Sequence, residues 1–338
     1  MAVALLCRYF GPFTEVSRTR RLTAETAGLR RVMPTHQSSV PRNATWLRAF
    51  ALLVAAGSAA LLAQAPGKLD KAALTKYVIY LERWPADAQV ALSDPKDATG
   101  LPGFQEITVE RTRLGRVVAQ RRYFLSKDGE RFFKTDIFQF SEPPYEATRQ
   151  ILSKGTWPSI GPVGAPVTLV VFADLQCPDC AAESKIIREL LPVEFPKQVQ
   201  VQFRDYPLVQ HHWAMNAAMA GRCVFQSNPA LFWDYADWAY AHQKEITETN
   251  FQEKLDQWSK DKKLGSTFDA CVAQRSTEAD VKKSIATGLA LEVPGTPTLF
   301  LNGRMVPMDT DWPTLKWMID YELKTTMPGE SCCLVDPR

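Results

Sequence analysis

The segment FADLQCPDC at positions 172–180 completes an apolar run that begins with VTLVVF at 167–172. The run predicts a buried strand, and the next helix is predicted to begin at Cys177. Cys177 and Cys180 would then lie on one helical turn, close enough to form a small disulfide. The positive end of the helix dipole favours the thiolate of the first cysteine. This arrangement predicts dithiol–disulfide exchange.

The charge of the chain is unevenly divided along its length. The 338 residues carry a net charge of +3, and their 46% hydrophobic content is typical of globular protein. Residues 1–48 hold eight Arg against two Glu, a charge of +6, which leaves −3 on the remainder. A nucleic-acid-binding protein needs clustered Lys and Arg on its folded part. The sequence has no such cluster, so we predict no nucleic-acid partner.

Residues 1–65 are typical of a leader that ends in a signal peptide. The uncharged apolar stretch 49–63 follows Arg48 and ends in the small-x-small pattern Ala63-Gln64-Ala65. Its fifteen residues are too few for an ordinary membrane span and suit a signal peptide that ends near Ala65. A start at Met33 would account for the long segment before it. An uncleaved N-terminal membrane anchor is the alternative, and both interpretations predict a periplasmic or extracytoplasmic protein.

Residues 66–152 predict a small α+β domain. Apolar spacing predicts a helix over Leu69–Trp84, and hairpin breaks at 114–115 and 127–129 separate three antiparallel strands. These strands are Gln105–Arg113, Arg116–Leu125 and Arg131–Phe140. One face of the sheet is expected to pack on the helix. The other is expected to be partly exposed and to carry Phe124, Phe132, Phe133 and Phe138.

From residue 153 to 326 the pattern changes to strand, helix and strand. The predicted elements are the strand Val167–Ala173, the helix Cys177–Leu191 and the strand Gln198–Phe203. Five helices are predicted within an insert over about 209–289: His212–Gln226, Pro229–His242, Asn250–Lys260, Ser266–Gln274 and Ser276–Leu289. A hairpin of Pro297–Leu301 with Gly303–Pro307 and the helix Trp312–Lys324 complete the domain, and residues 327–338 form a tail. This order predicts an α/β thioredoxin fold with an inserted helical domain.

Four ordered segments resemble the DsbA-like branch of the thioredoxin superfamily. They are FADLQCPDC at 172–180, FRDYPL at 203–208, HHWAMNAAMAGRC at 211–223 and VPGTPTLFLNG at 293–303. The resemblance covers roughly residues 155–325 and implies a protein thiol–disulfide oxidoreductase. It also implies that Pro297 is a cis-proline beside the active site, with Thr296 offering backbone hydrogen bonds to an extended client. A trans-proline in an edge strand is the alternative.

A second resemblance concerns the first domain. The segment RRYFLSKDGERFFKTDIF at 121–138 resembles the N-terminal dimerisation domain of DsbC- and DsbG-type disulfide isomerases. It implies a homodimer.

Two acidic residues lie close in sequence to the predicted thiol pair. Cys177 is the predicted nucleophile, and Cys180, one turn deeper, is the predicted buried resolving thiol. The carboxylate of Asp179 is expected to raise the pKa of Cys177 and so to weaken the pair as an oxidant. Asp174, at the end of the strand, is a candidate proton acceptor for Cys180, and a helix-entry cap is the equal alternative.

The other cysteines and the histidines bear on disulfides and metals. Cys223 and Cys271, 48 positions apart, are a candidate structural disulfide in an oxidising compartment, with two buried thiols as the alternative. Zinc would need two ligands besides the CxxC pair. Adjacent Cys332 and Cys333 are poorly spaced for one ion, and His211 and His212 are expected to cap a helix at the surface. We therefore predict neither a metal nor a cofactor.

The direction of exchange stays open at this stage. The preferred function is oxidation of client proteins, and the resemblance implies reoxidation by a DsbB- or VKOR-type membrane partner. The first alternative is a dimeric isomerase or reductase that uses the reduced pair, which Thr296 and the additional domain favour. The second is a periplasmic binding or chaperone protein with secondary redox activity.

Overall fold

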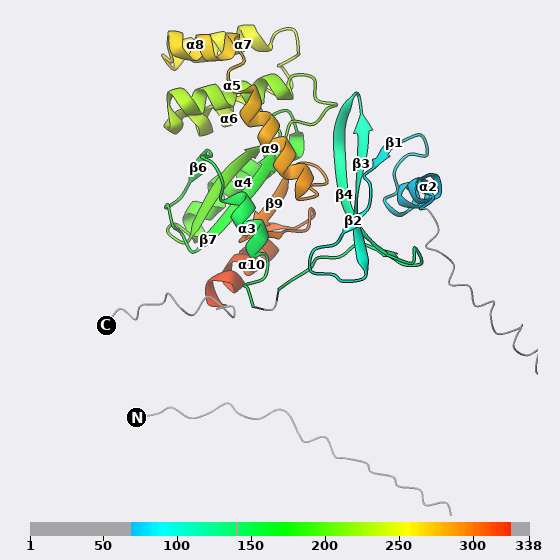
Figure 1. The fold of residues 1–338 in the computed structure, drawn as a ribbon. Coiled ribbons are helices and arrows are strands. Elements are labelled where there is room, and N and C mark those ends of the chain that lie inside the picture. The colour runs from blue at the N-terminus through cyan, green and yellow to red at the C-terminus, as the bar shows by residue number, and fades with distance from the viewer. Residues whose placement is uncertain (1–68, 140, 326–338) are drawn as a thin grey trace, which may run out of the picture. The chain divides into compact units, whose positions relative to one another are not determined.

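The structure of the chain is a computed structural model that describes residues 69–139 and 141–325 (Figure 1). The predicted leader, including Met33 and the cleavage site near Ala65, lies outside these residues, as do the tail 327–338 and its two cysteines. Within the described ranges, no helix combines the length and apolar character needed to cross a membrane.

The first part contains one helix and an antiparallel sheet. Helix α2, Lys71–Leu81, begins after Asp70, whose carboxylate accepts hydrogen bonds from two N–H groups of the first turn. The strands are β1 Gln89–Leu92, β2 Lys96–Asp97, β3 Phe104–Arg113, β4 Arg116–Ser126 and β5 Phe132–Phe133. Their order is β1-β3-β4-β5, and β2 also pairs with β3. The turn between β3 and β4 needs positive φ at Leu114 and Gly115, as tight hairpins do.

The aromatic residues of this sheet are distributed differently from the prediction. Phe132 stacks on Tyr123, with ring centroids 4.5 Å apart, and packs with the core residues of α2. Phe124 and Phe133 pair across β4 and β5, and Phe124 is buried rather than exposed. The expectation of one exposed aromatic face was wrong because neighbouring residues on a strand point to opposite faces. Of the four rings, Phe138 is exposed.

The second part contains a mixed sheet around one long parallel pair. Strand β7, Val167–Ala173, runs parallel to β8, Val199–Asp205. The remaining strands are antiparallel to their neighbours: β6 Ser159–Ile160, β9 Thr298–Leu301 and β10 Arg304–Met305. The order β10-β9-β7-β8-β6 places β7 at the centre, where its almost continuous apolar side chains are buried. The predicted α/β fold class is confirmed.

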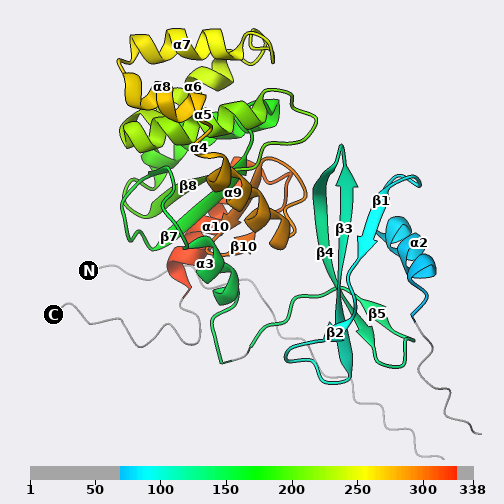
Figure 2. The same cartoon turned by 45° about the horizontal axis from the view of Figure 1, so that its top comes forward.

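Helices follow this sheet in the predicted order. Helix α4, Pro178–Glu194, connects β7 to β8, and α10, Trp312–Lys324, follows β10. Between β8 and β9 come α5 Ala214–Ser227, the 3₁₀ turn Pro229–Leu231, α6 Phe232–Ala241, α7 Phe251–Asp261, α8 Ser266–Ala273 and α9 Glu278–Ala290. Helices α5 and α6 lie between the sheet and the pair α7 and α8 (Figures 1 and 2). One hydrophobic cluster joins Val171 and Phe203 of the sheet to Phe232 and Leu255 of the inserted helices.

Several short elements were not predicted, although β9 and β10 lie within the predicted hairpin. Helix α3, Glu146–Leu152, was not among the predicted elements, and Leu152 packs in a cluster with Val170 and Phe300. Strands β1, β2 and β6 were also missed, and β5 has two residues instead of the ten expected over Arg131–Phe140. Two-residue strands are too short to produce a period in the sequence.

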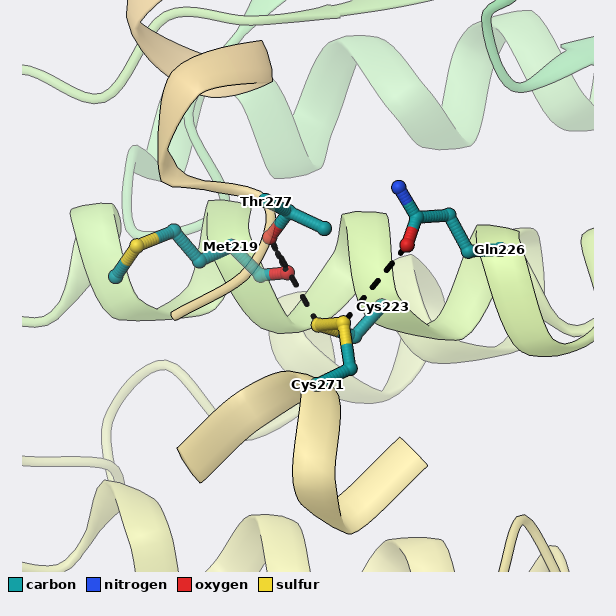
Figure 3. The surroundings of a disulfide bond; sticks show 5 residues. All are labelled: Met219, Cys223, Gln226, Cys271 and Thr277. Atoms are coloured by element: carbon teal, nitrogen blue, oxygen red, sulfur yellow. Dashed lines mark hydrogen bonds between the residues drawn. A yellow bond between two sulfur atoms is a disulfide. The ribbon is translucent and has the colours of Figure 1, made fainter. Parts of the chain in front are cut away.

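A disulfide bond links two helices of the insert. Cys223 of α5 and Cys271 of α8 are joined with an S–S distance of 2.03 Å (Figure 3). Beside the bond, the hydroxyl of Thr277 donates to the carbonyl oxygen of Met219 at 2.8 Å (Figure 3). The bond therefore ties α8 to α5, a helix with many buried residues.

Candidate active site

The two thiols of the CxxC motif lie at the start of α4. Cys177 occupies the N-cap position with extended backbone angles, and Pro178 follows at the first helical position, where its fixed φ suits a helix start. The N–H of Cys177 donates to the carbonyl oxygen of Asp174 at 3.0 Å, which closes the turn between β7 and α4. Cys177 and Cys180 are free thiols and expose 5% and 2% of their surface. Both thiols are therefore buried.

A segment distant in sequence lies against Cys177. The Cys177 thiol donates to the carbonyl oxygen of Thr296, with Sγ and O 3.4 Å apart. The peptide bond between Thr296 and Pro297 is cis. Both residues directly precede β9, which pairs with β7, so the sheet itself brings them to the start of α4.

The two thiols differ in acidity. The pKa of Cys177 falls to about 6, mainly because the Cys180 thiol is hydrogen-bonded to it. Burial opposes this shift, while the N–H groups of Cys180 and Asp179 and the side chain of Thr296 support it. Burial, followed by the neighbouring Cys177 thiolate, raises the pKa of Cys180 well above its usual value. The geometry therefore favours a Cys177 thiolate beside a protonated Cys180.

The side chain of Asp179 is exposed on the first turn of α4. We expected its carboxylate to raise the pKa of Cys177, but the net shift is downward. The contribution of Asp179 to that shift comes from its backbone N–H. An exposed carboxylate is well solvated, so its effect on a buried thiol is small compared with direct hydrogen bonds.

Asp174 holds the turn before α4. Its carboxylate accepts from the N–H of Gln176 at 2.7 Å and of Leu208 at 2.8 Å, and its Oδ2 lies 2.6 Å from Nδ1 of His211. Only the backbone N–H of Asp174 contacts Cys180, with a distance of 3.4 Å to Sγ. The carboxylate, which is fully buried, therefore binds the turn before α4 and the segment after β8, and it hydrogen-bonds neither to Cys180 nor to an N–H group of α4.

His211 is a site residue whose place we misjudged. It precedes α5, which begins at Ala214, and its side chain is 20% exposed rather than a surface cap. The hydrogen bond to Asp174 raises the pKa of His211, burial lowers it, and the charges of Asp174 and Cys177 raise it further. One sequence signal was available. The segment after β8 must start at the sheet edge where β7 also ends, because parallel strands have their carboxyl ends together.

Two glutamines, also missed, connect the insert to the same turn. The side-chain oxygen of Gln176 accepts from the N–H of Trp213 at 2.9 Å. Nε2 of Gln243, just after α6, donates to the carbonyl oxygens of Leu175 and Cys177 at 3.0 and 2.9 Å. No sequence signal identifies Gln243, because an amide in a polar loop is ordinary.

The metal alternative has no ligand set in the part of the chain that the structure describes. No group of three or more His, Cys, Asp and Glu side chains there has the arrangement of a metal site.

Known proteins resemble the second part of the chain. A family model described as "Thioredoxin" matches residues 153–321, half of the chain. A "Probable disulfide bond formation protein D" of Bacillus anthracis is 27% identical over 196 residues, which cover 56% of this chain and 89% of the relative. The protein of the same name from Bacillus cereus is 28% identical over 181 residues, 52% of this chain and 82% of the relative. The crystal structure of oxidised BdbD from Bacillus subtilis has a TM-score of 0.43 and 24% identity, and covers 50% of this chain and 94% of that one.

Proposed function

The chain belongs to the thioredoxin family, and on that premise we propose that it is an exported protein thiol–disulfide oxidoreductase. In this proposal the chain exchanges disulfides with client proteins through Cys177 and Cys180. The observation that carries the proposal is the pair of free, buried thiols at the start of α4, with Sγ of Cys177 against the carbonyl oxygen of Thr296. The pKa of Cys177 falls to about 6, whereas burial holds that of Cys180 above its usual value. One thiol is thereby prepared to attack or leave as a thiolate, and the other to keep its proton.

The exchange proceeds in two displacements. A client thiolate attacks Sγ of Cys177 in the oxidised protein, the Cys177–Cys180 bond breaks, and Cys180 departs with the electron pair and takes up a proton. A second client thiolate then attacks the client sulfur of the mixed disulfide, and Cys177 leaves as a thiolate. The client has lost two electrons to the protein and has gained a disulfide. The low pKa of Cys177 makes it the better leaving group in the second step.

Thr296 and Pro297 would form the wall on which the client lies. The carbonyl oxygen of Thr296 is 3.4 Å from Sγ of Cys177, so an extended client segment beside it would place a client sulfur near the nucleophile. Backbone hydrogen bonds of this kind fit many client sequences, because they do not depend on side chains.

The acidity of Cys177 also bears on direction. A stabilised thiolate favours the reduced form of the pair, and a pair that favours its reduced form is an oxidant. We therefore propose client oxidation over isomerisation or reduction. Reoxidation would then come from a DsbB- or VKOR-type membrane partner outside the cytoplasm. The apolar segment 49–63, as an export signal, would bring the chain to that compartment. A homodimer formed through a domain at 66–152 remains part of the alternative.

Two assays test the proposal together. Oxidised protein is mixed with reduced ribonuclease, and reduced protein with insulin, using the wild type and Cys177→Ser. We expect the wild type to form ribonuclease disulfides faster than it reduces insulin, and the variant to do neither. A fully active Cys177→Ser variant would refute the catalytic role, and an equilibrium with glutathione near that of thioredoxin-like reductants would refute the oxidant direction.

A further inference from the structure

The thiolate of Cys177 has no cationic neighbour within its own motif. The two residues between the cysteines are Pro178 and Asp179, of which one is neutral and the other acidic. A thiolate in a protein is stabilised by hydrogen bonds, by a helix N-terminus and by nearby cations. The first two are present at Cys177. A cation would have to come from another segment.

The segment that follows β8 supplies one candidate. His211 has Nδ1 2.6 Å from Oδ2 of Asp174, and Asp174 closes the turn whose last residue is Cys177, through the bond from the Cys177 N–H to the Asp174 carbonyl oxygen. Two residues after His211, the N–H of Trp213 donates to the side chain of Gln176, the neighbour of Cys177. The histidine is therefore fixed beside the nucleophile's turn at two points.

The partner of His211 is arranged to hold a positive charge. The carboxylate of Asp174 is fully buried and accepts two backbone N–H groups, those of Gln176 and Leu208, which hold it in place. A buried carboxylate at hydrogen-bond distance favours the imidazolium form of histidine over the neutral ring. His211 feels the charge of Cys177 as well as that of Asp174.

We propose that His211, held by the buried carboxylate of Asp174, is the cationic partner of the Cys177 thiolate. The inference rests on the proposed exchange through Cys177. His211 is a positioning residue in the electrostatic sense: it acts on Cys177 by its charge, and Asp174 fixes where that charge lies. Pro178 and Asp179 provide no cation, and His211, at the start of the insert, provides one instead.

The charged groups around His211 set the sign of its effect. Asp174, directly after β7, is hydrogen-bonded to it, Cys177 at the start of α4 acts on it by its charge, and its own segment adds the exposed His212. Since opposite charges attract, a protonated His211 lowers the energy of the Cys177 thiolate. By reciprocity, the thiolate must raise the affinity of His211 for its proton. Oxidation of the pair removes the thiolate and so weakens proton binding at His211.

The test compares His211→Gln with His212→Gln, an exposed neighbour on the same segment. Ultraviolet absorbance of the thiolate is followed against pH in the reduced proteins. We expect the pKa of Cys177 to rise by about one unit in His211→Gln, the lower end of the effect of a nearby opposite charge, and to stay at its wild-type value in His212→Gln. Equal pKa values in the two variants and the wild type would overturn the proposal.

The rate of exchange with a small disulfide separates charge from structure. At acidic pH, His211→Gln should react more slowly than the wild type, because a smaller fraction of Cys177 is thiolate. At alkaline pH it should react equally fast or faster, because a thiolate of higher pKa is the stronger nucleophile. A uniform loss of rate at every pH would mean a structural defect and would overturn the electrostatic role.

A third measurement uses the wild-type protein. The ring resonances of His211 should titrate at a higher pH in the reduced than in the oxidised protein, and identical titrations would contradict the proposal. The proposed function fails in a different way: the wild-type Cys177 would then show an ordinary thiol pKa, or Cys177→Ser would still exchange. If Cys177 has a low pKa in the wild type and the same pKa in His211→Gln, only the proposed role of His211 is refuted.

Discussion

Cys177 and Cys180 carry the same functional group one helical turn apart, and their surroundings make them chemically different. Cys180 has lost nearly all of its solvent, so its charged form is costly, and its thiol is hydrogen-bonded to Cys177. Cys177 has N–H groups of the first helical turn beside it and can hold the charge. The asymmetry of the site thus arises from the order of the two residues along one helix.

Replacing Cys180 tests the largest contribution to the acidity of Cys177. Cys180→Ala removes the hydrogen bond from the thiol, so we expect the pKa of Cys177 to rise from about 6 towards its ordinary value. Cys180→Ser keeps a donor at the same place and should give an intermediate value. Both are measured by thiolate absorbance against pH in proteins with one active-site cysteine. A Cys180→Ala protein that titrates like Cys180→Ser would contradict the account.

The stability of the reduced protein should depend on pH in a defined window. The folded-state pKa of Cys177 is depressed to about 6, so its contribution is complete above the unfolded value of about 8.5 and is lost as the pH falls through the folded value. We expect the free energy of unfolding to rise between these pH values by at most about 1.4 kcal/mol per pH unit. Urea titrations of reduced and Cys177→Ser proteins measure it. Equal slopes in that window would refute the shift.

At this scale, the sequence predicts residues that belong to a contiguous motif. Cys177 and Cys180 could be identified from their spacing, and Pro297 from a resemblance that spans several segments. The contacts of Asp174 could not be predicted, because its three partners come from the turn and from the segment after β8. His211 was misjudged for the same reason, since a histidine before a helix is usually solvated.

At the scale of the elements, the helical insert is part of the active-site structure. It shares the main hydrophobic cluster with the sheet. It also donates to the turn before α4 at two points, from Trp213 to Gln176 and from Gln243 to the carbonyl oxygens of Leu175 and Cys177. The carbonyl oxygen of Cys177 also accepts the N–H of Ala181 in α4. Movement of the insert would therefore be transmitted to Cys177.

Gln243 provides a test of this connection. Gln243→Ala removes the donor to the carbonyl oxygen of Leu175 and one of the two donors to that of Cys177, so we expect the free energy of unfolding to fall by about 1–3 kcal/mol. Gln243→Glu places a carboxylate against those oxygens and should raise the pKa of Cys177 as well. Urea denaturation and thiolate titration measure the two effects, with the exposed Gln274→Ala as control. The connection is unimportant if Gln243→Ala and Gln274→Ala are equally stable.

The disulfide of the insert should act on stability alone. It closes a loop with a sequence separation of 48 between α5 and α8, on the helices rather than at the thiol pair. Replacing both Cys223 and Cys271 by Ala should lower the free energy of unfolding by about 2–4 kcal/mol, the usual range for a native disulfide. The pKa of Cys177, measured in the same protein, should not change. A large change there would mean that the bond also shapes the active-site turn.

The long elements were predictable, whereas several of the short ones were not. The apolar run of β7 matches its predicted bounds, and so does α10, because each is long enough for its period to be visible. Strands β2, β5 and β6 have two residues each and owe their conformation to a neighbouring strand. Helix α3 was missed because seven residues after two prolines show little periodicity.

At the scale of the whole molecule, the two sheets have separate cores. The cluster of the first sheet contains Leu74 and Val78 of α2, and the cluster around β7 and β9 contains Val170 and Phe300. Leu152, at the end of α3, belongs to the latter. The predicted domain boundary between residues 152 and 153 stays a prediction. Because Leu152 packs with Val170 and Phe300, the boundary is best tested by removing α3.

Two fragments decide whether α3 is needed by the catalytic part. Fragment 141–326 retains α3, whereas fragment 153–326 loses the buried Leu152, a change that costs about 2–5 kcal/mol when such a side chain is removed from a core. It also loses the carbonyl oxygen of Leu152, to which Nη2 of the buried Arg204 donates. A buried guanidinium deprived of an acceptor adds a further penalty. We therefore expect fragment 153–326 to unfold at a clearly lower urea concentration than fragment 141–326. Circular dichroism measures both unfolding transitions. Equal midpoints would place the start of the catalytic domain at 153 and leave α3 to the linker.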